Sequence, residues 1–458
     1  MRSRYFIFGM LLSMLIAVSC KDDDIGGVPY DPTKPVKLAT FTPDSGKFLE
    51  NVLITGENFG NDPAKIKVYF NTRPAAVIGT TGTRIYVTAP RLPGDTCAIS
   101  VVVGNGPHTL GKDSLVFDRD FYYTASITVA TIVGNGIQTE SIFGGSLADT
   151  QIQPRYLAMD AEGNLFCNTR SNDDVGSGTT QFIKINEEKD ECVKLVDVTG
   201  NIPCVAPETQ IVSFPTESTV GSFYTADPRD NWAPHWREFK MPLKTEILND
   251  GDIPAVAGGS STYTYPHSGW KHAMTVNPVD GYIYTRFQMG QVIRINPQNY
   301  EVDLLLQTQS GDTYGICFRP GEPNVMYLTG WTDCGVFANS VCSVNVTDPA
   351  NTWQILSSTT ADHRDGPLES ARFNGPCQMY SDADDNLYIA DFHNHCIRRI
   401  SPDNIVETVL GIPKTSGFKD GTKAEAMFYR PRGIAISEDG TVYVADLGNA
   451  RIRKLSIN

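Results

Sequence analysis

The sequence predicts an all-β protein, in which a small immunoglobulin-like sandwich precedes a six-bladed β-propeller closed by a strand from its N-terminal side. Two observations support this class. The chain of 458 residues holds 40 glycines and 28 prolines between short alternating apolar runs, which is typical of many short strands joined by turns. Residues 126–458 also contain a repeat of about 55 residues, a length suited to a four-stranded propeller blade.

Residues 1–19 are predicted to be an export signal. Arg2 and Arg4 precede an apolar stretch at 6–18, which is too short to span a bilayer comfortably. The stretch ends at Ser19-Cys20, which resembles the lipobox of bacterial lipoproteins. The resemblance implies that Cys20 is acylated and becomes the mature N-terminus. The alternative is an ordinary signal peptide with an unrelated cysteine.

Residues 20–35 are predicted to be an acylated cysteine followed by a flexible tether. The run Lys21-Asp22-Asp23-Asp24 resembles the surface-export signal of lipoproteins from some glycan-degrading Gram-negative bacteria. That resemblance implies the outer face of the outer membrane, whereas a plain solvated linker would suit the periplasm. Two glycines and three prolines follow, which is the composition of a linker.

Residues 36–123 contain short alternating strands at the spacing expected of a sandwich. Four segments resemble the IPT/TIG immunoglobulin-like domain: 41–46, 54–60, 68–71 and 87–90. In the second segment we expect Asn58 to hydrogen-bond its own backbone and Phe59 to plug the end of the sandwich. The expected role of this domain is that of a spacer, and direct ligand binding is the alternative.

The repeat in residues 126–458 is clearest at its C-terminal end. Residues 371–376 align with 426–431, and residues 387–391 align with 442–446. Residues 431–453 resemble NHL repeats, a resemblance that is faint in the middle copies. The last copy stops one strand short, so we expect residues 127–133 to supply the missing strand and close the ring. Six blades fit the length, with five or seven as alternatives.

The repeat alignment selects residues at the start of the inner strands, where propellers bind ligands. We expect these side chains to line a polar, locally basic channel rim, where arginine would act as a forked donor to a hydroxyl-rich or acidic ligand. Simple solvation of the rim is the alternative. The predicted rim residues are Arg155, His272, Tyr314 and Arg432.

The longest departure from the repeat is an aromatic loop at residues 226–237. Indole rings beside polar donors form a natural sugar platform, because the ring face contacts C–H groups while the donors bind hydroxyls. The alternative is that these rings fold down as loop plugs. The predicted platform residues are Trp232, His235, Trp236 and Arg237, with Trp270 and Trp331 as further candidates.

Catalytic and metal-binding signals are weak. His393 and His395 form a pair, but His363 is the nearest third ligand, so we expect no metal and no cofactor. Asp391 and Asp446 fit turn caps better than catalytic acids. No serine-nucleophile elbow, phosphate loop or zinc-protease motif occurs in the sequence.

Nine cysteines remain after Cys20, an odd number that cannot all pair. The pairs Cys334/Cys342 and Cys192/Cys204 are close enough in sequence to be considered. Buried free thiols are the commoner arrangement, and Cys167 and Cys317 fit it.

The net charge of −14 argues against nucleic acid as a partner. The leading hypothesis is a cell-surface lipoprotein whose propeller binds glycan and supports polysaccharide uptake, with a surface transporter complex as a further partner. Its domain order resembles that of accessory surface proteins in bacterial polysaccharide-utilisation systems. Alternatives are a propeller lyase or hydrolase acting on oligosaccharide, and a protein–protein scaffold.

Overall fold

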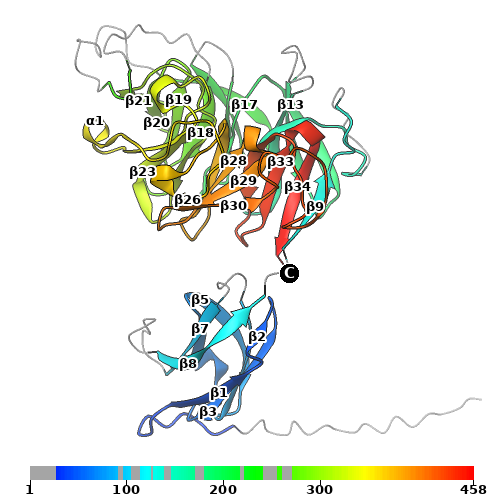
Figure 1. Ribbon diagram of the computed structural model, residues 1–458, viewed down its shortest axis with the longest axis vertical. Helices are drawn as coiled ribbons and strands as arrows, with labels where there is room; N and C mark the ends of the chain where they lie inside the picture. The colour runs from blue at the N-terminus through cyan, green and yellow to red at the C-terminus, as the bar shows by residue number, and fades with distance from the viewer. Residues whose placement is uncertain are drawn as a thin grey trace, which may run out of the picture. The chain divides into compact units, whose positions relative to one another are not determined.

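The computed structural model describes residues 27–90, 96–104, 114–124, 127–138, 146–170, 180–216, 221–240, 255–259 and 271–457. The chain divides into two compact units, the first ending at residue 126 and the second spanning 127–457. Figure 1 shows the strands of the first unit in blue to cyan and the ring of blades in the second. Cys20 and Trp270 lie outside the described residues. No described helix is long and apolar enough to cross a membrane.

The first unit is a β-sandwich around one apolar core. Its strands hydrogen-bond in the order β1-β3-β6-β5-β4-β7-β8-β2. Phe41, Ile54 and Phe121 are almost completely buried between the sheets. The elements are β1 (Lys37–Thr42), β2 (Ser45–Gly46), β3 (Asn51–Glu57), η1 (Pro63–Lys65), β4 (Ile66–Phe70), β5 (Arg73–Thr80), β6 (Arg84–Thr88), β7 (Thr96–Val103) and β8 (Leu115–Tyr123).

Asn58 and Phe59 directly follow strand β3 and make different contacts. Phe59 is 1% exposed and packs into the sandwich core, as predicted. Asn58 does not bond its own backbone: its Nδ2 donates to the carbonyls of Asp31 at 2.9 Å and Lys34 at 2.8 Å, and its Oδ1 accepts the Asp31 N–H. The prediction for Asn58 was therefore wrong, because the asparagine fastens the segment before β1 onto the sandwich.

The second unit is a six-bladed propeller whose blades follow one another around the ring. Blades 1 and 2 are β10 (Pro154–Met159), β11 (Asn164–Arg170), β12 (Thr180–Asn186) and β13 (Glu191–Asp197), then β14 (Cys204–Val205), β15 (Val212–Pro215), β16 (Ser222–Ala226) and β17 (Pro234–Glu238). Blades 3 and 4 are β18 (Lys271–Val276), β19 (Ile283–Phe287), β20 (Gln291–Ile295) and β21 (Val302–Gln307), then β22 (Ile316–Arg319), β23 (Glu322–Thr329), β24 (Val341–Asn345) and β25 (Gln354–Ile355).

The last two blades each gain a short fifth strand. Blade 5 comprises β26 (Gly366–Pro367), β27 (Pro376–Ser381), β28 (Leu387–Asp391), β29 (Cys396–Ile400) and β30 (Ile405–Leu410), and blade 6 comprises β31 (Gly421–Thr422), β32 (Pro431–Ile436), β33 (Val442–Asp446), β34 (Arg451–Ile457) and β9. The described helices of this unit are single turns: η2 (Pro228–Asp230), η3 (Gly335–Phe337), α1 (Pro349–Thr352), η4 (Leu368–Ser370), η5 (Phe392–Asn394) and η6 (Leu447–Asn449).

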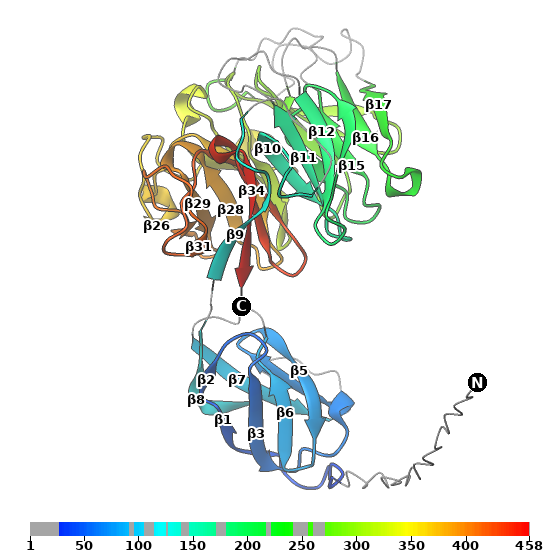
Figure 2. The same ribbon diagram turned by 90° about the vertical axis from the view of Figure 1, so that its right-hand side faces the viewer.

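Strand β9 (Ile127–Val133) closes the ring, as the sequence predicted. It pairs antiparallel with β34 from Ile127↔Ile457 to Val133↔Ile452, so the first strand of the unit completes the last blade. Figure 2 shows β9 and β34 side by side. Joining the two ends of the unit in one sheet removes the open edge that an incomplete blade would present.

Burial explains the residue pattern across each blade. Inner strands β10 and β32 are buried at every position, because a neighbouring blade covers each of their faces. Outer strand β13 has only exposed and half-buried residues. The hairpins between inner and second strands turn through glycines with positive φ, namely Gly163 at 78° and Gly440 at 81°.

A buried ion pair anchors each of the two C-terminal blades. Arg398 and Arg453 are 0% exposed, and each donates through Nη1 to an equally buried aspartate, Asp391 or Asp446, at 2.9 Å. The other aspartate oxygen accepts the backbone N–H of Asn374 or Tyr429 at 2.8 Å. These aspartates tie the blade together internally.

The nine cysteines among the described residues are all free, and eight of them are buried. Neither candidate pair is bonded. Burial raises the pKa of Cys334 and of Cys342 to about 12, so both remain protonated thiols at neutral pH.

Candidate functional site

The inner strands begin with a β-bulge at the predicted rim positions. In β10 the pairing with β11 skips Arg155, in β18 it skips His272, and in β32 it skips Arg432. A bulged residue leaves the regular alternation of the strand, and this can turn its side chain towards the channel. The repeated position that the sequence selected therefore corresponds to a repeated backbone irregularity. For His272 the structure describes the backbone only.

Two tyrosines from opposite blades meet across the centre of the ring. Tyr156 of blade 1 stacks on Tyr314, which precedes the inner strand of blade 4, with ring centroids 5.9 Å apart and planes at 21°. Arg432 of blade 6 donates from Nε to the Tyr156 hydroxyl at 2.9 Å. Its guanidinium carbon lies 5.0 Å from the Tyr314 ring centroid. These three side chains bridge the central channel at this level.

Burial shows that this layer is a plug. Arg155 is 4% exposed, and Tyr314 and Arg432 are 7% exposed, so at this depth the predicted rim side chains fill the channel. Gln378 adds to the plug, since its Oε1 accepts the backbone N–H groups of Leu157 at 3.0 Å and Ile434 at 3.1 Å. Burial, followed by the neighbouring Tyr156, raises the pKa of Tyr314, which stays a neutral donor to Asp312.

A half-buried layer lies against the plug. The Trp331 ring contacts Tyr314 edge-on at 5.3 Å and lies 5.4 Å from His393 at a tilt of 34°. The guanidinium carbon of Arg430 lies 5.8 Å from the centroid of Phe392, which also contacts Trp331. Trp331, His393 and Arg430 are partly accessible. We call the combined set the aromatic–arginine cluster: Tyr156, Tyr314, Trp331, Phe392, His393, Arg430 and Arg432.

The three histidines that could have formed a metal site have separate partners. His363 Nε2 lies 2.8 Å from Thr408 Oγ1, and His395 Nδ1 accepts the backbone N–H of Arg430 at 3.2 Å. Burial and the charge of Arg430 lower the pKa of His393, so its imidazole is neutral at pH 7. Within the described ranges, no group of three His, Cys, Asp or Glu side chains is placed to hold a metal ion.

The predicted aromatic loop is divided between the core and the surface of blade 2. Trp232 is 9% exposed and packs against Phe166, while Lys184 Nζ lies 4.1 Å from its ring centroid. It is a loop plug, which was the alternative interpretation. Trp236 is 51% exposed on outer strand β17.

The polar residues of the same loop have local partners. His235 Nε2 lies 2.7 Å from Asp230 Oδ2, and Arg237 donates from Nε to Thr225 Oγ1 at 3.1 Å. Trp331 contacts none of the loop rings in the described contacts and joins the aromatic–arginine cluster instead.

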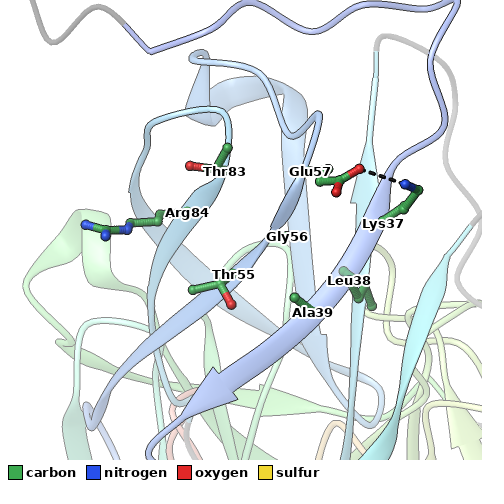
Figure 3. Close-up of a pocket in the computed structure, with 8 residues that line it drawn as sticks. All are labelled: Lys37, Leu38, Ala39, Thr55, Gly56, Glu57, Thr83 and Arg84. Atoms are coloured by element: carbon green, nitrogen blue, oxygen red, sulfur yellow. Dashed lines mark hydrogen bonds and ion pairs between the residues drawn. The ribbon is translucent and has the colours of Figure 1, made fainter.

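The first unit has a shallow surface depression between β1, β3 and β6 (Figure 3). On its rim, Lys37 Nζ and Glu57 Oε2 form an ion pair at 2.8 Å, and both side chains are more than half exposed. The remaining lining includes Thr55, Thr83 and Arg84. No buried polar side chain is directed into it among these lining residues, so it offers less specific chemistry than the cluster in the propeller.

Sequence reasoning did not place Tyr156, Phe392, His393 or Arg430 in a ligand-binding site, and it considered His393 only as a metal ligand. Three of these carried a signal in the repeat itself. Phe392 and His393 stand where the next copy has Leu447 and Gly448. Arg430 stands where the preceding copy has a glycine. Departures from a repeat at one corner of the blade would have pointed to this cluster.

Comparison with known families agrees with the fold. Residues 37–118 match the IPT/TIG domain, and residues 428–455 match the NHL repeat. The chain thus combines an IPT/TIG domain with a six-bladed propeller of the NHL type, as its sequence predicted.

Three solved structures share this architecture over 94% of the chain. A Bacteroides thetaiotaomicron protein of unknown function is 24% identical, with a TM-score of 0.75 and 100% of its own chain covered. Auxiliary nutrient binding proteins from Bacteroides thetaiotaomicron and Bacteroides ovatus are 22% and 18% identical, with TM-scores of 0.55 and 0.54 and 99% and 100% of their chains covered. At these identities the similarity shows the fold alone.

Curated relatives match only a short stretch. SUPPRESSOR OF QUENCHING 1 of Arabidopsis thaliana is 40% identical over 76 residues, and Teneurin-3 of Mus musculus is 38% identical over 73 residues. These matches span 16% and 14% of this chain and only 7% and 3% of the two relatives.

Proposed function

We propose that this chain is a nutrient-binding surface lipoprotein whose propeller holds a glycan at the aromatic–arginine cluster. The observation that carries the proposal is the half-buried layer on the channel plug. There the Trp331 ring lies beside His393, with Arg430 close to the same group of rings. An indole face contacts the C–H groups of a sugar, while imidazole and guanidinium groups bind its hydroxyls.

The relatives of the same architecture support a nutrient-binding role. Two of them are named auxiliary nutrient binding proteins, and they come from two Bacteroides species. The plug supports binding at one end of the channel, because a ligand cannot pass the stacked Tyr156 and Tyr314 without separating them.

The proposed cellular location rests on the N-terminal sequence. Acylation of Cys20 would anchor the chain in the outer membrane, and Lys21-Asp22-Asp23-Asp24 would direct it to the outer face. More than one acyl chain makes such an anchor stable. The spacer role proposed for the IPT/TIG domain and the partnership with a surface transporter complex follow from this location.

Affinity electrophoresis and calorimetry on a polysaccharide panel test the binding site. Full-length protein purified in detergent should be retarded by at least one glycan. Trp331→Ala should weaken binding by about 2 kcal/mol or more, roughly thirtyfold in Kd, because it removes a central aromatic contact. His393→Ala provides a second variant that leaves the Trp331–Tyr314 contact in place.

Trp236→Ala is the matched control, since this exposed tryptophan lies on the outer strand of blade 2. It should leave the affinity unchanged. Loss of binding in Trp236→Ala with retention in Trp331→Ala would move the site to blade 2. Unchanged mobility of the wild type across the panel would refute glycan binding, and release of new reducing ends or unsaturated sugars would favour the enzyme alternative.

A further inference from the structure

The two C-terminal repeats differ at two positions in the aromatic–arginine cluster: where one repeat has glycine, the other has a bulky residue. In blade 5, Gly375 precedes the inner strand and His393 lies between the second and third strands. In blade 6 the equivalent positions, each 55 residues later (430 against 375, 448 against 393), hold Arg430 and Gly448. Each repeat therefore brings one bulky polar group to this corner, and the two groups differ.

Close contacts explain why both positions hold glycine. A Cβ atom on Gly375 would lie 2.7 Å from Cδ2 of His393 and 2.9 Å from Cζ3 of Trp331, so the contact between those rings requires glycine. A Cβ on Gly448 would lie 2.4 Å from Cδ1 of Tyr429. Glycine at 375 thus leaves room for the contact between His393 and Trp331. Glycine at 448 leaves room for the Tyr429 ring, over which the Arg430 guanidinium lies.

Arg430 keeps its place against a backbone preference. Its φ is 55°, in the left-handed region, where the equivalent Gly375 has a φ of 61°. Residues with a Cβ are disfavoured there, and such strain gathers at functional sites. Glycine would fit this backbone without strain, as it does in blade 5, so the presence of arginine points to a use for its side chain.

Positive charge converges on this corner. The guanidinium carbons of Arg430 and Arg432 lie 5.8 Å and 5.6 Å from the Phe392 centroid. Burial lowers the pKa of the adjacent His393, and the charges of Arg430 and Arg432 lower it further. Among the described residues next to the cluster, Asp312 accepts hydrogen bonds from the Tyr314 hydroxyl and Gln288 Nε2, and Asp333 accepts the Asp312 N–H.

We infer that the ligand of this site is an acidic glycan, whose carboxylate Arg430 binds through its forked guanidinium while the sugar ring lies on Trp331. The inference rests on the proposed function of the same site and names the ligand class. A planar guanidinium matches a carboxylate with two parallel hydrogen bonds, which gives both affinity and orientation. The site would thus select acidic sugars by local contacts, although the net negative charge of the protein repels them at long range.

The test compares polygalacturonate with the same polymer after methyl esterification, using full-length protein in detergent. The acidic polymer should bind about tenfold more tightly or better, because a hydrogen bond to a charged group is worth at least that factor. Raising the ionic strength from about 0.01 M to about 0.15 M shortens the Debye length from about 30 Å to about 8 Å. This screens the long-range repulsion from the acidic protein more than the half-buried contact at Arg430, so the preference for the acidic polymer should persist.

Arg430→Gly is the decisive variant, because it places the residue of the sister repeat on a left-handed backbone that favours glycine, and thermal unfolding checks that the variant is folded. It should lose the preference for the acidic polymer, while Arg229→Gln, which removes one charge from an exposed arginine on η2, should keep it. Equal affinity for both polymers, abolished by Trp331→Ala and unchanged by Arg430→Gly, would overturn the acidic ligand and leave glycan binding intact. Binding to neither polymer nor to any other acidic glycan would also overturn the inference, and only failure across the whole panel would refute the proposed function.

Discussion

At the scale of single residues, buried charge organises the C-terminal blades. Arg453 donates from Nη1 to Asp446 and to the Met427 carbonyl, from Nε to Asp420, and from Nη2 to the Lys419 carbonyl. Every donor group of the guanidinium thus has a partner within the repeat. Such a network is stable only when complete, since removing one member leaves a buried charge unpaired.

Arg453→Met should therefore lower the free energy of unfolding by about 3–5 kcal/mol, because Asp446 would remain buried without its counter-charge. Chemical denaturation followed by tryptophan fluorescence measures the loss. Lys419→Met is the control, since the Lys419–Glu425 pair is half exposed and should cost less than about 1 kcal/mol. Similar losses in the two variants would contradict the structural role of the buried pair.

At the scale of elements, the closing strand holds the ring together. β9 pairs with β34 on one side and with β31 on the other, so both of its edges are hydrogen-bonded. Val129 is 2% exposed on this strand, whereas the next residue, Ala130, is exposed. Substitutions at Val129 therefore test core packing, and substitutions at Ala130 test the solvent face of the same strand.

Val129→Asp should destabilise the propeller by about 3 kcal/mol or more, because it buries a carboxylate without a partner. Ala130→Asp introduces the same charge on the solvent face and should shift the thermal midpoint little. Differential scanning calorimetry of both variants checks this contrast. Equal midpoints would show that ring closure does not depend on the packing of β9.

At the scale of the whole molecule, the acidic net charge suits the proposed anchoring at a membrane surface. A net charge of −14 keeps a protein soluble beside a membrane and does not identify its partner. The aromatic–arginine cluster is locally positive within this acidic protein. Partner choice would then reside in one corner of the propeller, while the rest of the surface serves solubility.

Cys20→Ala should release the protein from the membrane fraction, because it removes the proposed acylation site. Replacing Lys21 to Asp24 by alanine should keep the protein in the membrane but protect it from protease added to intact cells. Fractionation and protease shaving with immunoblotting measure both effects. Membrane association of the Cys20 variant, or wild-type protein that stays uncut on intact cells, would contradict surface anchoring.

Repeat spacing and strand alternation are local patterns along the chain, so the two-part architecture, six blades as the best fit to the length, and closure by residues 127–133 could be predicted from the sequence. The repeat alignment also selected Arg155, His272 and Arg432, and the structure shows that the strand pairing skips these positions. The contact between Tyr156 and Tyr314 could not be predicted, because these residues are far apart in sequence and meet only when the closed ring brings opposite blades together at its centre. Likewise, only packing separated buried Trp232 from exposed Trp236 and brought Trp331 to His393 and Arg430. Sequence composition cannot distinguish a tryptophan that plugs a loop from one that faces a ligand, because the difference lies in which neighbours cover the ring.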